Sequence, residues 1–393
     1  MKKLIFIPLF ILSLTACQQD RSADIGHELN DYFEQSSLPS AVMGSIDKDG
    51  ETQWYAFGPS VWDQSDTVTE DHIFRIYSMT KAITSVAAMQ LVERGLIGLD
   101  DPLNDILPQM AAIPVLNEQG ELVEAENDIT LRHLLTHTAG FGYDFTSYRL
   151  QQFQPEEWEY QDKPRLFESG EDWKYGTGTD WVGRVVEKVS GDDLETYFRK
   201  NITGPLQMNR TWFNVPDSLQ DLIVSWGMRG PAGFQENPRL PEEPATFFSG
   251  GGGLYGSPAD YMTFLQCMLN YGSYDGGQIL KKETVEMMLT DQLPPDVGIN
   301  YEQFENGIMS YSGGFGDPAD RWGLAWALEN NPEDHPRPSG SVYWAGAANS
   351  YYTLDVENQL AVVYFTQFFP FNDKETYDFY RLFEQHVYIN SGY

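Results

Sequence analysis

The two ends of the chain follow strand-like patterns, whereas its middle follows a helical period. Ala23 to Gln35 has apolar residues at helical spacing and precedes a predicted hairpin of "AVMGSI", a "DKDG" turn and "TQWYAFG". Towards the other end, strands are predicted in "RWGLAWALE", "SVYWAGA", "SYYTLDV" and "QLAVVYFTQF", followed by a closing helix in "DKETYDFYRLFEQHVY". We therefore expect an α+β fold whose antiparallel sheet is built from both ends and flanked by the two terminal helices.

The middle of the chain predicts a mostly helical lobe. Helices are expected from Ser78 to near Gly95 and in the segments 130–136 (capped by Thr130), 181–189, 194–200 and 258–272. This pattern divides the chain from residue 17 to 393 into an α/β lobe, about 23–75 and 320–393, and a helical lobe, about 76–319. A cleft is expected between the lobes, because binding sites tend to form there.

The first residues have the features of an export signal. Met1-Lys2-Lys3 is followed by an apolar run from Leu4 to Leu14, which is short for a bilayer span. The sequence Leu14-Thr15-Ala16-Cys17 resembles the lipobox of bacterial lipoproteins. That resemblance implies that residues 1–16 are a signal peptide and that Cys17 carries lipid, so we expect an exported bacterial lipoprotein anchored to a membrane. The alternative is an ordinary secretory signal in which Cys17 has no role.

Charge and cysteine content narrow the possible partners. The formal net charge is −33, which argues against nucleic acid and anionic substrates, because phosphate-binding surfaces need clustered Lys and Arg. Such acidity suits a protein that faces a saline medium. If Cys17 is lipidated, Cys267 is the one cysteine left and no intramolecular disulfide can form. Stability must then come from packing.

A serine and a lysine stand three residues apart in "FRIYSMTKAITSVAAMQLVERG". On a helix, Ser78 and Lys81 share one face, and a helix this apolar is expected to be buried. Burial would lower the lysine pKa towards the neutral form, and a serine beside such a base is a candidate nucleophile. A second match, Ser45 to Lys48, runs into a turn and has no helix to hold the pair together. The structural alternative is a serine that bonds to the preceding turn and a lysine that pairs with a carboxylate.

Two further segments carry groups that such chemistry needs. Tyr175 lies in a glycine-flanked loop before a predicted helix, and a tyrosine beside an ammonium can share the removal of a serine proton. Alone, Tyr175 is one of 22 tyrosines and could equally serve packing. In "YWAGAANSYYTLD", the small residues Ala345, Gly346 and Ala347 would let a substrate approach the backbone, whose N–H groups could bind an oxyanion.

Five segments in this order resemble a known family. "SMTK", the tyrosine loop, "RHLLTHTAGFGY", "FFSGGGGLYGSPADYMTFLQCML" and "WAGAANSYYTLD" are similar to family VIII carboxylesterases, relatives of class C beta-lactamases and DD-peptidases. The resemblance covers most of the chain and implies a beta-lactamase/DD-peptidase-like fold. It further implies that Ser78 is the acylated nucleophile, that Lys81 and Tyr175 handle protons, and that the N–H groups of Ser78 and Ala347 form the oxyanion hole.

Two departures from class C beta-lactamases bear on the substrate. Where those enzymes carry Tyr-x-Asn, this chain has Thr177 at the third position, and where they carry Lys-Thr-Gly it reads Trp344-Ala345-Gly346. The chain therefore lacks both the amide-binding Asn and the cation that would meet a beta-lactam carboxylate. Trp344 would offer an apolar wall instead, as in the esterase relatives, and we expect Trp344, Gly346 and Thr177 to line the substrate pocket.

Other catalytic patterns do not fit. Gly-x-Ser-x-Gly is absent, His133 and His137 lack the Glu of a His-Glu-x-x-His zinc site, and glycines 250–253 are not closed by Gly-Lys-Ser/Thr. These glycines more plausibly permit a tight chain path beside the cleft. No metal and no organic cofactor are implied.

The sequence thus predicts a serine hydrolase that cleaves small-molecule carboxylic esters through an acyl-enzyme. One alternative is amide chemistry, as a beta-lactamase or a D-amino-acid peptidase. An alternative of another class is a surface binding lipoprotein without turnover. Segments 109–128 and 213–247 are expected to set the acyl and alcohol preference, and these patterns leave the oligomeric state open.

Overall fold

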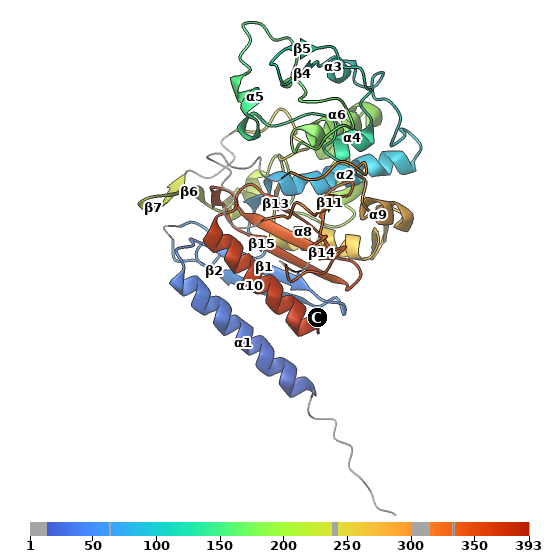
Figure 1. Cartoon of the computed structure of the whole chain (residues 1–393). Coiled ribbons are helices and arrows are strands. Elements are labelled where there is room, and N and C mark those ends of the chain that lie inside the picture. Colours follow the sequence, from blue (N-terminus) through green and yellow to red (C-terminus); the bar gives the residue numbers. More distant parts are fainter. Residues whose placement is uncertain are drawn as a thin grey trace, which may run out of the picture.

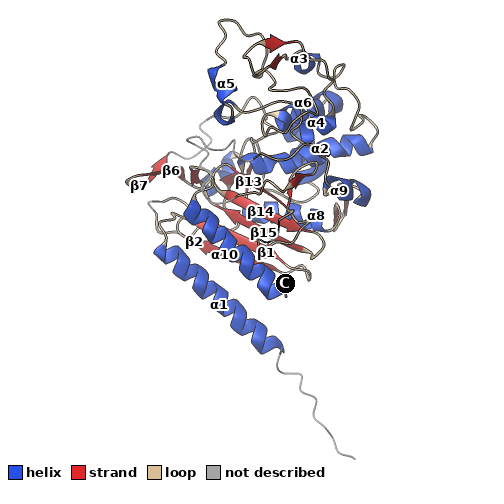
Figure 2. Ribbon diagram, viewed as in Figure 1, coloured by secondary structure: helices blue, strands red, loops and turns tan. Residues whose placement is uncertain are grey.

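The computed structural model describes residues 14–62, 64–237, 243–300, 315–331, 333 and 335–392. Figure 1 shows a sheet with two long helices in front of it and a lobe of shorter helices and loops above it. Figure 2 shows most strands in the lower part of the molecule, beside the two long helices, and the shorter helices mainly in the upper part. This is the α+β, beta-lactamase/DD-peptidase-like architecture expected from the sequence.

A seven-stranded antiparallel sheet forms the core of the part of the chain that the structure describes. Its order is β11 (Arg321–Trp322), β12 (Ala327–Leu328), β13 (Val342–Gly346), β14 (Ser350–Asp355), β15 (Leu360–Phe365), β1 (Ala41–Ile46) and β2 (Thr52–Phe57). The N-terminal hairpin joins the C-terminal strands through β1 and β15, where Val42 lies opposite Phe365. The prediction that both ends of the chain build one sheet is confirmed.

The prediction of the first C-terminal strand is wrong in one respect. "RWGLAWALE" is not one strand but two short ones, β11 and β12, joined by a tight turn. The Gly323 N–H donates to the Trp326 carbonyl at 3.0 Å and closes this turn. Gly323 lets the turn lie tightly against the chain at Met288, because a Cβ there would lie 2.2 Å from the Met288 carbonyl oxygen.

Helices cover both faces of the sheet. The terminal helices α1 (Leu14–Gln35) and α10 (Lys374–Ser391) lie side by side on one face (Figure 1). Neighbouring residues of β15 show that α8 (Pro258–Leu269) covers the other face: Tyr364 packs on Phe379 of α10, whereas Phe365 packs on Tyr261 of α8. α1 begins before the expected Ala23, and α8 lies against the sheet although its residues fall within the segment assigned to the helical lobe.

The helical lobe is built around α2. Its helices are α2 (Thr80–Glu93), α3 (Pro108–Ala111), α4 (Leu131–Leu135), α5 (Tyr148–Gln152), α6 (Gly178–Ser190), α7 (Leu194–Phe198) and α9 (Lys282–Met288). A π-helical turn, η3 (Arg199–Thr203), continues α7, and 3₁₀ turns lie at η1 (Tyr77–Met79), η2 (Asp144–Thr146) and η4 (Asp217–Leu222). Thr130 caps α4 as predicted, and residues 80–91 of α2 are buried throughout. α2 is therefore the central helix of this lobe.

Short strands connect the lobes. β6 (Trp226–Gly230) and β7 (Gly233–Asn237) form a hairpin that pairs with β16 (Phe368–Phe369), and β3 (Phe74–Arg75) pairs with β8 (Tyr255–Gly256). Two more pairs are β4 (Val115–Leu116) with β5 (Leu122–Val123) and β9 (Ser273–Tyr274) with β10 (Gly277–Gln278). Segment 109–128 thus contains the end of α3 and the β4–β5 hairpin, and segment 213–247 contains η4 and the β6–β7 hairpin.

Candidate active site

Ser78 lies in the middle of the η1 turn, directly before α2. The predicted helix therefore starts two residues later than Ser78, at Thr80, but the tight turn keeps Ser78 and Lys81 on the same side. Tyr77 has φ of +45°, a left-handed conformation that is costly for a large side chain. Such strain is often found at functional sites, and here it immediately precedes the candidate nucleophile.

Lys81 is buried and held by three groups. Its Nζ lies 3.4 Å from Ser78 Oγ, 3.1 Å from Tyr143 Oη and 2.6 Å from the Gly251 carbonyl oxygen. Its exposed fraction is 2%, so no water shell competes with these partners. Ser78 and Lys81 therefore lie close together, as predicted. The structural alternative required an ion pair between Lys81 and a carboxylate, and the ion pairs of the described residues do not include Lys81.

The expectation of a lowered pKa for Lys81 is wrong in direction. Burial alone would lower it, but electrostatic interactions with Tyr143 and Tyr175, and then with Asp180, outweigh burial, so the pKa of Lys81 is raised. The prediction failed because it counted desolvation and not the oxygens that surround the ammonium. Lys81 is therefore a cation in the folded protein at neutral pH.

Tyr175 lies over Lys81 in a box of aromatic side chains. The Lys81 Nζ is 4.8 Å from the centre of the Tyr175 ring, and the Trp344 indole N–H donates to Tyr175 Oη at 3.0 Å. His137 packs on the same ring at 4.7 Å. Gly176 allows this loop to pass the chain at Phe141, because a Cβ there would lie 2.3 Å from the Phe141 carbonyl oxygen. Trp344 is thus more than the apolar wall expected from the sequence, since its N–H orients Tyr175.

A small apolar pocket brings the candidate residues together. Among the described residues it is lined by Ser78, Tyr175, Phe315, Trp344, Ala345, Ala347 and Phe371. Gly346 sets the approach of β13 to the η1 turn, since a Cβ there would lie 2.5 Å from the Ile76 carbonyl oxygen. Ala347, whose N–H is a predicted oxyanion donor, is thereby held beside Ser78.

Two residues predicted for the substrate pocket lie outside its lining. The Thr177 hydroxyl donates to the Asp162 carboxylate, which also accepts from the Trp181 indole N–H at 3.0 Å. Thr177 therefore belongs to the start of α6 rather than to the pocket. Gly346 acts through close packing behind the pocket, not through its lining. The prediction placed them by motif position and could not foresee these neighbours.

Tyr143 is a site residue that the sequence analysis missed. It follows α4 and precedes the η2 turn, and burial raises the pKa of its phenol above the ordinary value despite the nearby Lys81. The one available signal was its position in "THTAGFGY", where two glycines precede an aromatic residue. Nothing in that stretch indicates a partner 62 residues earlier in the chain. Phe315 and Phe371 were missed for the same reason.

Glycines 250–253 do permit a tight path beside the site, as predicted. A Cβ on Gly250 would lie 2.8 Å from the Thr179 carbonyl oxygen, and one on Gly253 would lie 2.8 Å from the Phe213 ring. The carbonyl oxygens of this loop face α2, where Gly250 accepts from Thr84 Oγ1 at 2.7 Å and Gly251 accepts from Lys81. The loop therefore supplies backbone acceptors to the site.

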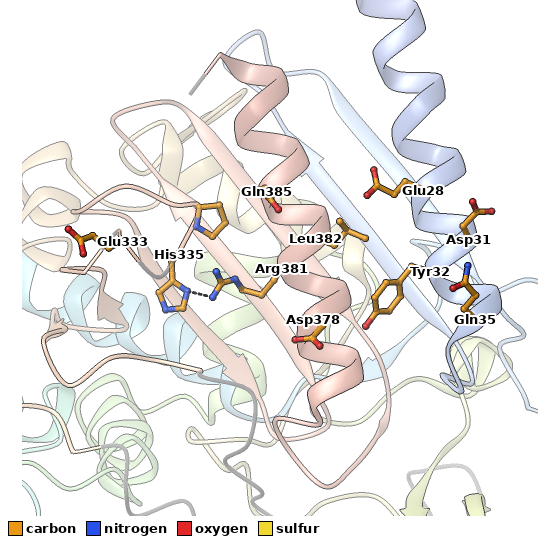
Figure 3. A pocket seen from close by; sticks show the side chains of 11 residues that line it. Glu28, Asp31, Tyr32, Gln35, Glu333, His335, Asp378, Arg381, Leu382 and Gln385 are labelled. Atoms are coloured by element: carbon orange, nitrogen blue, oxygen red, sulfur yellow. Dashed lines mark hydrogen bonds between the residues drawn. The ribbon is translucent and has the colours of Figure 1, made fainter.

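A separate cavity of about 790 Å³ lies between α1, α10 and the chain near His335. Figure 3 shows Glu28 and Tyr32 of α1 on the side that faces α10, whereas Arg381 of α10 points the other way, towards His335, to which it is hydrogen-bonded. None of its lining residues is a serine or cysteine, and none is shared with the Ser78 pocket. This cavity is therefore not part of the candidate active site.

The chain matches the beta-lactamase family over residues 29–386. It is 31% identical to monacolin J acid methylbutanoyltransferase of Aspergillus terreus, covering 89% of this chain and 92% of that protein. It is 30% identical to lovastatin esterase of Penicillium rubens, over 75% and 79% of the two chains.

Solved structures give the same picture. Unliganded simvastatin synthase from Aspergillus terreus superposes with a TM-score of 0.80 at 28% identity, covering 93% of this chain and 98% of that one. The hydrolase EstCE1, described as having promiscuous acyltransferase activity, has a TM-score of 0.73 at 20% identity over 94% and 99% of the chains, a likeness of fold alone. The chain therefore belongs to the beta-lactamase family and has the fold of its penicillin-binding-protein-like serine hydrolases.

Proposed function

We propose that this protein is a serine hydrolase that cleaves carboxylic esters through an acyl-enzyme on Ser78. The observation that carries the proposal is the contact of Ser78 Oγ with the buried Lys81 amine, 3.4 Å away, in a pocket that also holds Tyr175. A serine needs a proton acceptor to become a nucleophile, and this cluster supplies one. The esterase and acyltransferase relatives support the same chemistry.

In the proposed cycle the Lys81–Tyr175 pair takes the Ser78 proton while Ser78 Oγ bonds to the ester carbonyl carbon. The negative charge on the carbonyl oxygen is bound by the N–H groups of Ser78 and Ala347. Tyr175 then returns the proton to the departing alcohol, and water repeats both steps to release the acid.

The lining of the pocket favours esters over beta-lactams. In the described residues it presents aromatic rings and small side chains, with no lysine or arginine that would meet a carboxylate. Trp344 occupies the position of the beta-lactamase lysine and is engaged with Tyr175. Amide hydrolysis, by a beta-lactamase or a D-amino-acid peptidase, is therefore the less favoured alternative.

Acyl transfer is a second candidate, favoured by the similarity to a methylbutanoyltransferase over 89% of the chain. An acyl-enzyme passes its acyl group to water or to another alcohol, depending on which occupies the site. Both outcomes use the same Ser78 intermediate, and the acceptor alone separates them.

The deciding experiment measures hydrolysis of p-nitrophenyl acetate, butyrate and octanoate beside nitrocefin, with Ser78→Ala as control and with an added alcohol as acceptor. Ester turnover that Ser78→Ala abolishes, with little nitrocefin cleavage, supports the esterase. A new ester in the presence of the alcohol adds acyl transfer. Faster nitrocefin cleavage would favour the beta-lactamase. No turnover and no labelling by a fluorophosphonate would favour the binding lipoprotein.

We further propose export and lipid attachment at Cys17, on the lipobox-like sequence alone. Residues 1–13 of the signal lie outside the described residues, and residues 14–17 begin α1. No helix in the described ranges is both long and apolar enough to cross a membrane. Mass spectrometry of the chain expressed in a bacterium tests the proposal: a diacylated N-terminal Cys17 supports it, and an intact Met1 or an unmodified Cys17 contradicts it.

A further inference from the structure

The ammonium of Lys81 is fixed mainly by the loop of glycines that follows Ser249. Its contact of 2.6 Å with the Gly251 carbonyl oxygen is shorter than its contacts with Ser78 and Tyr143. Thr84, one turn further along α2, donates to the preceding carbonyl, that of Gly250, at 2.7 Å. Two successive carbonyls of the loop thus lie against one face of α2, and the position of Lys81 depends on the position of the loop.

Asp180 holds this loop from the other side. It lies in the first turn of α6, and its Oδ1 accepts hydrogen bonds from the Ser249 hydroxyl and from the Gly251 N–H, the latter at 3.1 Å. Gly251 therefore points its N–H at the Asp180 carboxylate and its carbonyl at the Lys81 ammonium. The backbone of Gly251 thus links the Asp180 carboxylate to the Lys81 ammonium.

The fit leaves no space for a side chain on either of these two glycines. A Cβ on Gly251 would lie 2.4 Å from Asp180 Oδ2, and one on Gly250 would lie 3.0 Å from Thr84 Cγ2. The loop is therefore confined between α6 and α2, with Asp180 on one side and Lys81 on the other. Asp180 also contributes to the raised pKa of Lys81 through its charge.

We propose that Asp180 is a positioning residue for the reaction at Ser78: it fixes the Ser249–Gly251 loop, and through the Gly251 carbonyl it fixes and stabilises the Lys81 ammonium. The proposal rests on the proposed function for its kinetic consequence. Its structural half, that the loop and Lys81 move when the Asp180 charge is removed, does not depend on turnover.

Asp180 could instead have a purely structural role. It lies in the first turn of α6, where a negative charge stabilises the helix through its dipole. Asp193 provides the matched control. It caps α7, accepting from the Thr196 N–H at 2.7 Å, and it is not among the groups that shift the pKa of Lys81. If Asp180 served α6 alone, Asp180→Asn and Asp193→Asn would have similar consequences.

The test compares Asp180→Asn, Asp180→Glu and Asp193→Asn with wild type on p-nitrophenyl butyrate. We expect Asp180→Asn to lower kcat by about tenfold or more, the loss of one charge-assisted hydrogen-bond network, with KM changed less than about threefold. The alkaline limb of the kcat/KM profile should move to lower pH, because the lost charge no longer stabilises the ammonium. Asp180→Glu should recover part of kcat, and Asp193→Asn should leave kcat and the profile unchanged.

A crystal structure of Asp180→Asn separates the two proposals. A displaced loop and a broken Lys81–Gly251 contact support the positioning role, even if wild type proves inactive and the proposed esterase fails. An unchanged contact, or unchanged kcat in a folded variant, overturns the positioning role and leaves the esterase standing. Should Asp180→Asn fail to fold, Ser249→Ala removes one of the two loop bonds, and an unaltered kcat there overturns the proposal.

Discussion

Lys81 shows at the scale of single residues how a buried cation can be kept charged. Its amine is surrounded by oxygens of Ser78, Tyr143 and Gly251, and the Tyr175 ring lies over it. Desolvation of a lone lysine would lower its pKa, but here electrostatic interactions with Tyr143, Tyr175 and Asp180 outweigh burial and raise the pKa of Lys81.

Tyr143→Phe tests how much one of these oxygens contributes. The change removes the hydroxyl 3.1 Å from Lys81 Nζ and keeps the ring, so the ammonium retains Gly251 and Ser78. We expect kcat/KM for p-nitrophenyl butyrate to fall about tenfold, the equivalent of one hydrogen bond to a charged group. Lys81→Met should cost about a thousandfold, because the proton-handling pair itself is lost. Equal rates for Tyr143→Phe and wild type would contradict the role given to Tyr143.

Trp344→Phe isolates the indole N–H. The ring still lines the pocket, but Tyr175 Oη loses its donor at 3.0 Å. Because that donor orients the Tyr175 hydroxyl, kcat should fall about tenfold while KM stays within about threefold. Steady-state kinetics with p-nitrophenyl butyrate measure both. A rise in KM at unchanged kcat would mean that Trp344 serves as an apolar wall only.

At the scale of elements, the site depends on β13 lying tight against the η1 turn. Gly346→Ala would place a Cβ 2.5 Å from the Ile76 carbonyl oxygen, so the strand and the turn must separate. We expect a loss of about 1–3 kcal/mol in the free energy of unfolding, as for overpacked cores, and a fall in kcat because Ala347 moves away from Ser78. Urea unfolding and kinetics measure the two effects.

Gly298→Ala is the control for that change, because a Cβ at Gly298 meets nothing within 4 Å among the described residues. Its free energy of unfolding should stay within about 0.5 kcal/mol of wild type. If Gly346→Ala behaved like Gly298→Ala, the close approach of β13 to the Ser78 turn would not matter for activity.

At the scale of the whole molecule, charge is the dominant feature. A formal net charge of −33 means that the folded chain repels itself, and salt screens such repulsion. Thermal unfolding followed by circular dichroism should therefore show Tm rising by several degrees as NaCl increases from about 0.05 M to about 1 M. A Tm and an activity that are highest in dilute buffer and fall with salt would contradict adaptation to a saline medium.

A buried ionic cluster joins the sheet to α10 and makes stability depend on pH. Arg337 bonds to Glu329 at 3.0 Å and to Glu384 at 3.3 Å, and the Asp320 carboxylate nearby accepts from the Tyr343 hydroxyl. Burial raises the pKa of both Asp320 and Glu329 above their ordinary values. Their contribution to stability is therefore complete below the unfolded-state pKa near 4 and declines as pH rises through the raised folded value.

Asp320→Asn tests this titration. An amide cannot ionise, so the Tm of the variant should change less with pH above about 4 than the Tm of wild type. Tm measured at several pH values in one ionic strength gives the slope. A slope equal to that of wild type would show that Asp320 does not titrate in this range.

The sequence by itself determined most of the elements and the serine hydrolase family. Short runs rich in apolar and aromatic residues, bounded by turns, mark β1 and β13–β15, whose residues are buried throughout. The helical period of apolar residues marks α6. Ser78 and Lys81 are three residues apart, which places them on one side of a helical turn. The segments around them carry the family resemblance.

The tertiary structure alone decided which residues surround Lys81 and Tyr175. Tyr143 and Gly251, the partners of Lys81, stand 62 and 170 residues from it, and Trp344 stands 169 residues from Tyr175. No local pattern specifies such contacts, since they follow from the path of the whole chain. That is why the sign of the Lys81 pKa shift, the polar role of Trp344 and the place of Thr177 could not be predicted. Local geometry depends on neighbours in sequence, whereas the electrostatics of a buried site depend on neighbours in space.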